Sequence, residues 1–341
     1  MQTPKKQDGS AKQGADTSTT PPRVAPLIHT GPHPTEISVM LPVYEPDQRL
    51  IDALRSVLRQ DPGGHKMQIA VVDDASAHSD VEALVAAVAP PGRVEIHRAA
   101  RNRGLAGNWN ECVRLARGEV VHLLHQDDWV GEGFYARLRP AFSGHPEIGM
   151  AFCRHAFVDD ADRVTRRSHR ERWTAGPVRD WLETISERQR IQCVSALVRR
   201  SVYERLGGYR TDLKYAMDWE LWVRIAAHFR VWYEPQMLAY YRRHEANETA
   251  RLRRERMIAR DVFKAIGLFA EHLPAPERDR MLSAAYAHFA QRTLRQLESQ
   301  NAADGEMGAE LETVGAAIER ITRAPFSKLR YRRRAARLAR S

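Results

Sequence analysis

The sequence predicts an α/β fold in which a mostly parallel sheet is covered by helices on both faces. From Ile37 onward, short apolar runs alternate with helical stretches, and polar residues follow directly after several of the apolar runs. Strand–helix alternation of this kind is typical of a parallel sheet, because the helix carries the chain back to the starting edge. The 341 residues suffice for one such domain and a smaller helical appendage.

The first half of the chain shows this alternation most clearly. Each predicted strand is a short apolar run, and each predicted helix places apolar residues on one face. Strands are expected at 37–44, 68–74, 94–98 and 119–125, and helices at 47–60, 79–88 and 106–116. Beyond residue 145 we expect strands at 150–160, 191–200 and 231–244, a helix at 217–228, and a strongly helical region over 255–300.

Composition divides the chain further. Residues 1–35 are rich in Pro, Gly, Ser, Thr, Lys and Gln without periodicity, which predicts disorder. A boundary near residue 250 separates the α/β domain from the helical region. The predicted organisation is a disordered segment (1–35), an α/β domain (36–250, with halves at about 36–130 and 131–250), a helical extension (251–325) and a basic tail (326–341).

The net charge of +10 is concentrated at the C-terminus. Residues 326–341 contain seven lysines and arginines and no acid, so little net charge is left for the remainder. A nucleic-acid-binding domain carries its positive charge on the folded reading surface. The distribution therefore argues against a nucleic-acid partner.

Three scattered cysteines and the absence of a long apolar run suggest a cytoplasmic protein. Cys112, Cys153 and Cys193 form no CxxC pair, which fits a reducing compartment and argues against a zinc site. The first residues contain no apolar signal segment, and no run approaches the roughly 18–20 residues of a membrane span.

Polar residues cluster where the predicted strands end. The pairs Tyr44–Glu45, Asp73–Asp74 and Asp127–Asp128 each come directly after a strand. In open α/β sheets, ligands bind beyond the carboxyl ends of the strands. The three pairs therefore predict a ligand site at one edge of the sheet.

Asp127–Asp128 in HLLHQDDW suggests a metal site. Burying carboxylates without a partner is costly, and Mg²⁺ or Mn²⁺ shared with phosphates would compensate. Alternatively, the pair opens a turn and caps a following helix near 131–143. Asp74 has the same two interpretations: a contact to a nucleotide base or ribose, or ordinary turn chemistry.

Four segments in order resemble family 2 glycosyltransferases with the GT-A fold: PVYEPDQRLIDALRSVLRQ, VVDDAS, NRGLAGNWNECVRLARGEVVHLLHQDDW and AMDWELWVRIA. The resemblance covers about residues 36–245. No GxGxxG follows the first strand and no GxxxxGK[ST] is present, which disfavours a dinucleotide-binding domain or a P-loop NTPase.

The resemblance implies a nucleotide-sugar site. It assigns this site to a set of residues at the first strand ends: Pro42, Tyr44, Glu45, Asp74, Asn102, Gly104 and Asp127. Glu45 stands where many members have Asn. Asp128 corresponds to the principal metal ligand, and the chain reads Gln126–Asp127–Asp128 where others often have Asp-x-Asp.

The resemblance also implies a catalytic base and a second metal ligand. Asp218 matches the carboxylate that takes the proton from the acceptor hydroxyl, although Met217 replaces a frequent acid before it. Asp218 could instead only cap the helix, and Glu220 is the alternative base. His244 in YYRRHEANET would complete the metal or diphosphate site, or be structural, and Arg242 or Arg243 could contact phosphate.

The expected function is an inverting, Mn²⁺- or Mg²⁺-dependent transfer of one sugar from a nucleotide donor, UDP-sugar favoured, to a glycan, lipid-linked or other acceptor. No QxxRW-type signature of processive synthases is present. The alternatives are a non-catalytic binding module of the same fold and a nucleotidyltransferase, which would carry a Gly-rich basic loop after the first strand. The basic tail 326–341 either contacts anionic lipid at the inner face of a membrane or is solvated.

Overall fold

The fold is built around one ten-stranded mixed sheet. The computed structural model describes residues 35–299, 307–321 and 325–339. Its strands run in the order β3-β2-β1-β4-β9-β6-β10-β5, with β7 beside β6 and β8 beside β10. The strands are β1 (Ile37–Val43), β2 (Met67–Asp73), β3 (Glu95–Arg98), β4 (Val120–Leu123), β5 (Trp129–Val130), β6 (Ile148–Val158), β7 (Val164–Arg167), β8 (Gly176–Pro177), β9 (Ala196–Arg199) and β10 (Arg230–Arg242). Neighbours among β3, β2, β1 and β4 pair in parallel, as predicted.

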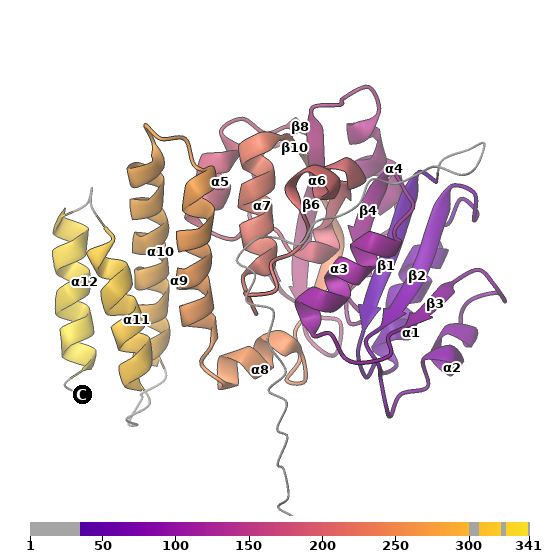
Figure 1. The fold of residues 1–341 in the computed structure, drawn as a ribbon, viewed down its shortest axis with the longest axis horizontal. Coiled ribbons are helices and arrows are strands. Elements are labelled where there is room, and N and C mark those ends of the chain that lie inside the picture. The colour runs from indigo at the N-terminus through magenta and orange to yellow at the C-terminus, as the bar shows by residue number, and fades with distance from the viewer. Residues whose placement is uncertain (1–34, 300–306, 322–324, 340–341) are drawn as a thin grey trace, which may run out of the picture.

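Helices cover both faces of the sheet, and the last helices of the chain continue as a stack beside α7 (Figure 1). The helices are α1 (Arg49–Leu58), α2 (Val81–Ala86), α3 (Leu105–Leu115), α4 (Phe134–Leu138), α5 (Trp181–Glu187), α6 (Arg200–Leu206), α7 (Met217–His228), α8 (Glu248–Arg254), α9 (Ile258–Phe269), α10 (Arg278–Ser299), α11 (Met307–Glu319) and α12 (Pro325–Leu338). Elements predicted in the first half of the chain are present with ends shifted by a few residues.

Burial on both faces explains why the first strands are almost continuously apolar. Every residue of β1 is buried. Met40 packs into the core beneath α3, whereas its neighbours Val39 and Leu41 belong to the core beneath α1. Successive side chains of a strand point to opposite faces, so a strand covered on both sides needs apolar residues at both parities.

The second half of the chain departs from the prediction in two places. The strand expected at 191–200 is wrong in extent: a 3₁₀ turn occupies Cys193–Ser195, β9 covers four residues, and α6 begins at Arg200. The structure also contains α5, α6, β7 and β8, which the sequence did not indicate. These elements are short, so they carry too few residues to show a period.

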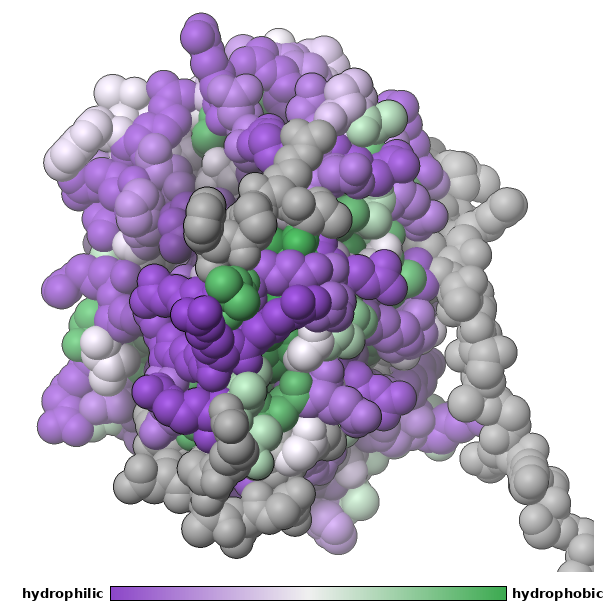
Figure 2. All heavy atoms as spheres, turned by 90° about the vertical axis from the view of Figure 1, so that its left-hand side faces the viewer, coloured by the Kyte–Doolittle hydropathy of each residue, from purple (hydrophilic) through white to green (hydrophobic). Residues whose placement is uncertain are grey.

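The C-terminal helices share their core with the sheet domain. Trp219 of α7 meets Phe269 of α9 at a ring-centroid distance of 5.2 Å, and the same apolar cluster continues through Phe289 of α10 to Val314 of α11. The outer face of this helical stack is mostly hydrophilic (Figure 2). Within the described ranges, no helix is long and apolar enough to cross a membrane.

The segment predicted as a basic tail forms helix α12 over most of its described length. Tyr331 is buried against the helical core, and α12 packs on α10 and α11. Part of its charge is paired: Lys328 and Arg332 contact Glu319, while Arg334 and Arg337 contact Glu298. The prediction of disorder for residues 1–35 lies, except for Thr35, outside the described part of the chain.

Asp261 of α9 holds the backbone segment that directly precedes α7. Its carboxylate accepts hydrogen bonds from the backbone N–H groups of Lys214 (3.0 Å), Tyr215 (2.7 Å) and Ala216 (2.8 Å). These residues directly precede Met217, where α7 begins. A single buried carboxylate of the helical extension therefore positions the first turn of α7, which carries Asp218.

Asp261→Ala should lower the free energy of unfolding by about 2–3 kcal/mol, because it leaves three backbone donors without their charged acceptor. Urea denaturation of the full chain measures this loss. Asp279→Ala, which removes an exposed carboxylate from α10, is the matched control and should cost less than about 1 kcal/mol. Equal losses in the two variants would contradict the role of Asp261.

Candidate functional site

The carboxyl ends of β1, β2 and β4 open into one cleft of about 1360 Å³. Pro42, Tyr44, Asp74 and Asp127 all line it, as predicted from their positions after strands. The opposite wall comes from the second half of the chain and from α8, α9 and α10. The cleft therefore lies between the parallel half of the sheet and the helical extension.

Asp74 holds the loop that begins α3. Its two oxygens accept hydrogen bonds from the backbone N–H groups of Arg103 (2.8 Å) and Gly104 (3.0 Å). Asn102 Oδ1 also accepts from Gly104 N at 2.9 Å. Gly104 has φ 74°, a conformation that favours glycine, and it forms the N-cap of α3. Asp74, Asn102 and Gly104 thus form one structural unit on the cleft wall, and burial raises the pKa of Asp74 despite these bonds.

Tyr44 is exposed at the mouth of the cleft and is tied to the loop after β4. Its backbone N–H donates to Gln126 Oε1 at 2.9 Å, and Gln126 Nε2 donates to its carbonyl oxygen at 3.2 Å. No role was predicted for Gln126. Its amide matches both backbone groups of Tyr44 and so joins two strand ends that are 82 residues apart.

Glu45 faces the loop after β2 and does not line the cleft. Its carboxylate accepts hydrogen bonds from the backbone N–H groups of Ala77 (2.7 Å), His78 (3.1 Å) and Ser79 (3.1 Å). The bond from Ala77 is the main reason that the pKa of Glu45 is lowered. A direct contact of this side chain with a ligand in the cleft does not fit this arrangement, and Glu45 instead supports the loop beside Asp74.

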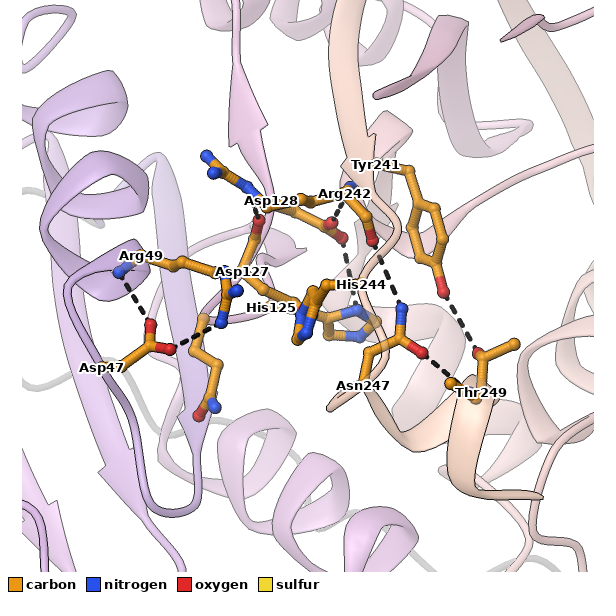
Figure 3. A network of polar contacts seen from close by, with 12 residues as sticks. Asp47, Arg49, His125, Asp127, Asp128, Tyr241, Arg242, His244, Asn247 and Thr249 are labelled. Carbon is orange, nitrogen blue, oxygen red and sulfur yellow. Dashed lines mark hydrogen bonds and ion pairs between the residues drawn. The ribbon is translucent and has the colours of Figure 1, made fainter. Parts of the chain in front are cut away.

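His125, Asp127 and Asp128 form a compact group at the end of β4, with potential ligand atoms within 4.8 Å of one another. Asp128 is fully buried, and its Oδ1 accepts from the backbone N–H of Arg242 at 2.9 Å. His125 Nδ1 lies 3.5 Å from Asp128 Oδ2. Figure 3 shows these residues converging with His244 from the end of β10.

Burial and charge set the protonation of this group. Burial, and then the neighbouring charge of Asp127, raises the pKa of Asp128 to about 6. Burial works against protonation of His125, but its contact with Asp128 outweighs this effect and raises the pKa of the imidazole. The histidine ring is also stacked on Trp109, with centroids 4.8 Å apart.

His244 joins the group through Asp127. Its Nε2 lies 2.9 Å from Asp127 Oδ2, so the histidine predicted as a metal ligand contacts the carboxylate predicted to lie nearer the ribose. Arg242 is held away from the cleft by Asp162 (3.1 Å) and Asp52 (3.6 Å), and its Nε donates to the carbonyl oxygen of Asp127. Arg243, by contrast, lines the cleft.

The group has the properties of a divalent cation site. Three of its buried atoms, namely Asp128 Oδ2, His125 Nε2 and His244 Nδ1, have no hydrogen-bond partner among the described residues. Unpaired buried acceptors are costly, and carboxylate oxygens with imidazole nitrogen suit Mn²⁺ or Mg²⁺. His125 was not predicted, although it stands two residues before Asp127.

Asp218 lies at the first turn of α7 on the cleft wall. Its Oδ2 accepts a hydrogen bond from Gln189 Nε2 at 2.8 Å, and its Oδ1 accepts from the N–H of Trp219 at 2.6 Å. Burial raises the pKa of Asp218 to about 7. His125 and Asp218 each shift the pKa of the other, so the metal-type group and this carboxylate share one part of the cleft.

Glu220, the alternative base, is excluded by its partners. It is completely buried and pairs with Arg224 through both carboxylate oxygens, at 3.0 and 2.8 Å. Arg224 in turn donates to the carbonyl oxygens of Leu206 and Gly208. Glu220 therefore stabilises the packing of α7 and does not line the cleft.

The family model described as Glycosyl transferase family 2 matches residues 38–207, about half of the chain. The chain belongs to glycosyl transferase family 2. The family and the GT-A fold predicted from the four motifs are confirmed, and the protein is a glycosyltransferase. Asp218 and His244 lie beyond the matched residues.

Two curated relatives extend over much of this glycosyltransferase. An uncharacterised protein of Mycobacterium tuberculosis is 29% identical over 240 residues, which cover 66% of this chain and 73% of that protein. The succinoglycan biosynthesis protein ExoU of Rhizobium meliloti is 24% identical over 210 residues, covering 58% of this chain and 59% of ExoU.

Two solved structures share the fold. S. aureus TarS residues 1–349, in complex with UDP-GlcNAc, has a TM-score of 0.65 at 17% identity and covers 84% of this chain and 82% of that one. The mannosyltransferase PcManGT from Pyrobaculum calidifontis, in complex with GDP-Man and Mn²⁺, has a TM-score of 0.50 at 21% identity. The match covers 93% of this chain and 90% of PcManGT. At these identities, the likeness concerns the fold.

Replacing Asp218 by Asn should stabilise the protein more at pH 8 than at pH 5. The folded state raises the pKa of this carboxyl to about 7, so ionising it above that pH costs free energy in the folded chain only. Stability is therefore lost as the pH rises from the unfolded value of about 4 to about 7, and Asn removes the loss. Urea denaturation at both pH values measures the difference.

Asp279→Asn exchanges the same atoms on the exposed surface of α10 and serves as the control for this pH series. The gain specific to pH 8 should be absent from it. A gain of Asp218→Asn that is the same at pH 5 and pH 8 would contradict the raised pKa.

Proposed function

We propose that this glycosyltransferase transfers one sugar from a nucleotide-sugar donor to a hydroxyl of a glycan, lipid-linked or other acceptor, with inversion at the anomeric carbon and with Mn²⁺ or Mg²⁺ as cofactor. The observation that carries the proposal is that Asp218 and His125 line the same cleft and lie close enough for each to shift the pKa of the other. A base and a cation-type group in one cleft are the two parts that such a displacement needs.

The donor site in this proposal uses the first wall of the cleft. Tyr44, Asp74 and the N-terminus of α3 would contact the nucleoside, and Asp127 the ribose. UDP-sugars are the favoured donors, which is supported by the UDP-GlcNAc complex of TarS.

Asp128, His125 and His244 are the residues that would hold the cation, with Asp127 close by. The cation would offset the charge of the departing nucleoside diphosphate. The Mn²⁺ complex of PcManGT supports this choice of ion.

Asp218 would act as the base. Its carboxylate takes the proton of the acceptor hydroxyl while the hydroxyl oxygen forms a bond to the anomeric carbon. The bond from that carbon to the diphosphate oxygen breaks, and its electron pair leaves with the diphosphate. Attack opposite the leaving group inverts the anomeric centre. A pKa of about 7 matches a base that works near neutral pH.

A role in cell-surface polysaccharide or glycoconjugate synthesis is supported by the relationship to the succinoglycan protein ExoU. Contact of 326–341 with anionic membrane stays a prediction. The pairing of four of its basic residues with Glu298 and Glu319 reduces the charge that α12 would offer to a lipid surface.

Asp218→Asn should reduce the transfer rate by about 10²–10⁴-fold and leave the affinity for UDP with Mn²⁺ within about twofold, because a base acts on the acceptor proton only. The wild-type rate should rise with pH up to about 7, as the carboxyl ionises. Nucleotide release in the presence of a UDP-sugar panel and bacterial glycan acceptors measures the rate, and calorimetry measures UDP binding.

Asp160→Asn is the control for this experiment, since it changes an exposed carboxylate outside the cleft. Full transfer by Asp218→Asn would remove the base from this position. UDP binding without turnover in the wild type, across the panel, would favour the non-catalytic binding module.

Asp128→Asn should weaken Mn²⁺-dependent UDP binding by about tenfold or more, since an amide oxygen carries no charge for the cation. In the wild type, Mn²⁺ affinity should fall as the pH drops below about 6, because protons then compete for Asp128. Calorimetry at pH 5 and pH 7.5, with and without EDTA, measures both effects. Unchanged UDP affinity in Asp128→Asn would contradict the cation site.

A further inference from the structure

The part of the cleft beyond Asp218 is strongly basic. Ten arginines and Lys214 line the whole cleft, against six acids. Three of those acids, namely Asp74, Asp127 and Asp218, belong to the site already described. The positive excess therefore lies on the wall made by β7, the segment after α5, the end of β10 and α10.

Four of these residues form what we call the arginine cluster: Arg166, Arg188, Arg243 and Arg292. They come from β7, the C-cap of α5, the residue after β10 and α10, so four separate elements bring them together. Other arginines of the cleft form ion pairs with carboxylates: Arg190 with Glu171, and Arg251 with Glu248. The four cluster members form no ion pair with a carboxylate among the residues described.

The cluster members are close enough to act on one another. Partial burial, followed by repulsion from Arg243 and Arg292, lowers the pKa of Arg166. The same charges act on His288 of α10. Burial lowers the pKa of its imidazole, and Arg188 and Arg292 lower it further. Gathering like charges at a partly desolvated wall costs free energy, which a bound anion would recover.

Buried hydrogen-bonding atoms without partners lie on the same wall. His155 of β6 is 2% exposed and lines the cleft, and its Nδ1 has no hydrogen-bond partner in the described part of the chain. The Nε atoms of Arg188 and Arg190 are likewise buried and unpartnered there. Unpaired buried polar atoms are costly, so these atoms point to a ligand that supplies oxygen acceptors.

The cluster adjoins Asp218 through the segment after α5. Arg188 and Arg190 flank Gln189, whose amide donates to the Asp218 carboxylate at 2.8 Å. The charges that act most on Asp128 and Asp218 come from Asp127 and His125 rather than from the cluster. The arginines are therefore set apart from the group that would hold the donor's diphosphate.

We propose that the acceptor of this glycosyltransferase carries a phosphate group, which binds to Arg166, Arg188, Arg243 and Arg292 while its hydroxyl faces Asp218. The assignment rests on the proposed transfer reaction, since it names the acceptor class of the same cleft. Arginine offers paired donors that match phosphate oxygens, and a phosphate has more oxygens to share among four guanidinium groups than a carboxylate has.

The test is direct binding to the full chain with the donor site filled by saturating UDP and Mn²⁺. The first probe is a poly(glycerol phosphate) oligomer, a soluble phosphodiester. The second is a phosphatidylcholine vesicle containing a polyprenyl diphosphate. Glycerol, vesicles without the diphosphate, and an oligogalacturonate, which carries carboxylates in place of phosphates, are the comparison probes.

Binding of either phosphate probe, with weaker binding of all comparison probes, is the expected result. Binding of the oligomer identifies a phosphodiester acceptor, and binding of the vesicle alone identifies a lipid diphosphate. Arg292→Gln and Arg166→Gln should each weaken this binding about tenfold, the effect of losing one charge-assisted contact. Arg292→Lys should retain part of it.

Arg295→Gln is the matched control: it removes the same charge from an exposed position of α10 outside the cleft, and should leave binding within about twofold. Circular dichroism of each variant verifies folding. The proposal is overturned if neither phosphate probe binds, if oligogalacturonate binds equally well, or if both Gln variants bind like the wild type.

These outcomes separate the acceptor assignment from the proposed function. UDP binding with Mn²⁺ is measured first on the same samples and does not involve the arginine cluster. Its absence would overturn the donor site, whereas intact UDP binding with no phosphate binding would overturn only the acceptor class.

Discussion

The hydrogen bond from the backbone N–H of Arg242 to the buried carboxylate of Asp128 joins the ends of β4 and β10, which are 114 residues apart in the chain. A carboxylate without solvent needs such a donor, and a backbone N–H at a strand end needs an acceptor. This contact satisfies both groups, while the pairing of Arg242 with Val158 of β6 holds the same end of β10 in the sheet. His244, two residues further on, is thereby placed against Asp127.

The two walls of the cleft favour ligands of opposite charge. At the end of β4, the buried carboxylate of Asp128 lies beside Asp127 and His125, which favours a cation. On the wall that includes β7 and α10, exposed guanidinium groups and the buried imidazole of His155 have no carboxylate partner among the described residues, which favours an anion. Asp218 lies between these walls, with a carboxyl whose pKa is about 7.

The C-terminal helices take part in the site as well as in the core. Asp261 of α9 holds the backbone before α7, and α10 contributes Arg292 to the cleft. The extension therefore does more than cover an apolar face of the sheet domain. The extension shares a core with α7 through the contact of Trp219 with Phe269. This packing holds the elements that carry Asp261 and Arg292 against the helix that carries Asp218.

The sequence by itself determined the parallel half of the sheet and the strand ends that line the cleft. Those strands are buried on both faces, so their apolar runs are continuous and easily recognised. The same pattern located Asp74, Asp127 and Asp128, because polar residues directly after such runs must lie at one edge of the sheet. The last of the four motifs added Asp218, and the segment YYRRHEANET added His244.

Only the tertiary structure decided what each of these residues contacts. It turned Glu45 toward the loop after β2, paired Glu220 with Arg224, and brought His125 and Gln126 into the site. It also gathered Arg166, Arg188, Arg243 and Arg292 from four elements into one wall. Hydrogen bonds and charge clusters between distant segments depend on packing geometry, and no local period in the sequence records them.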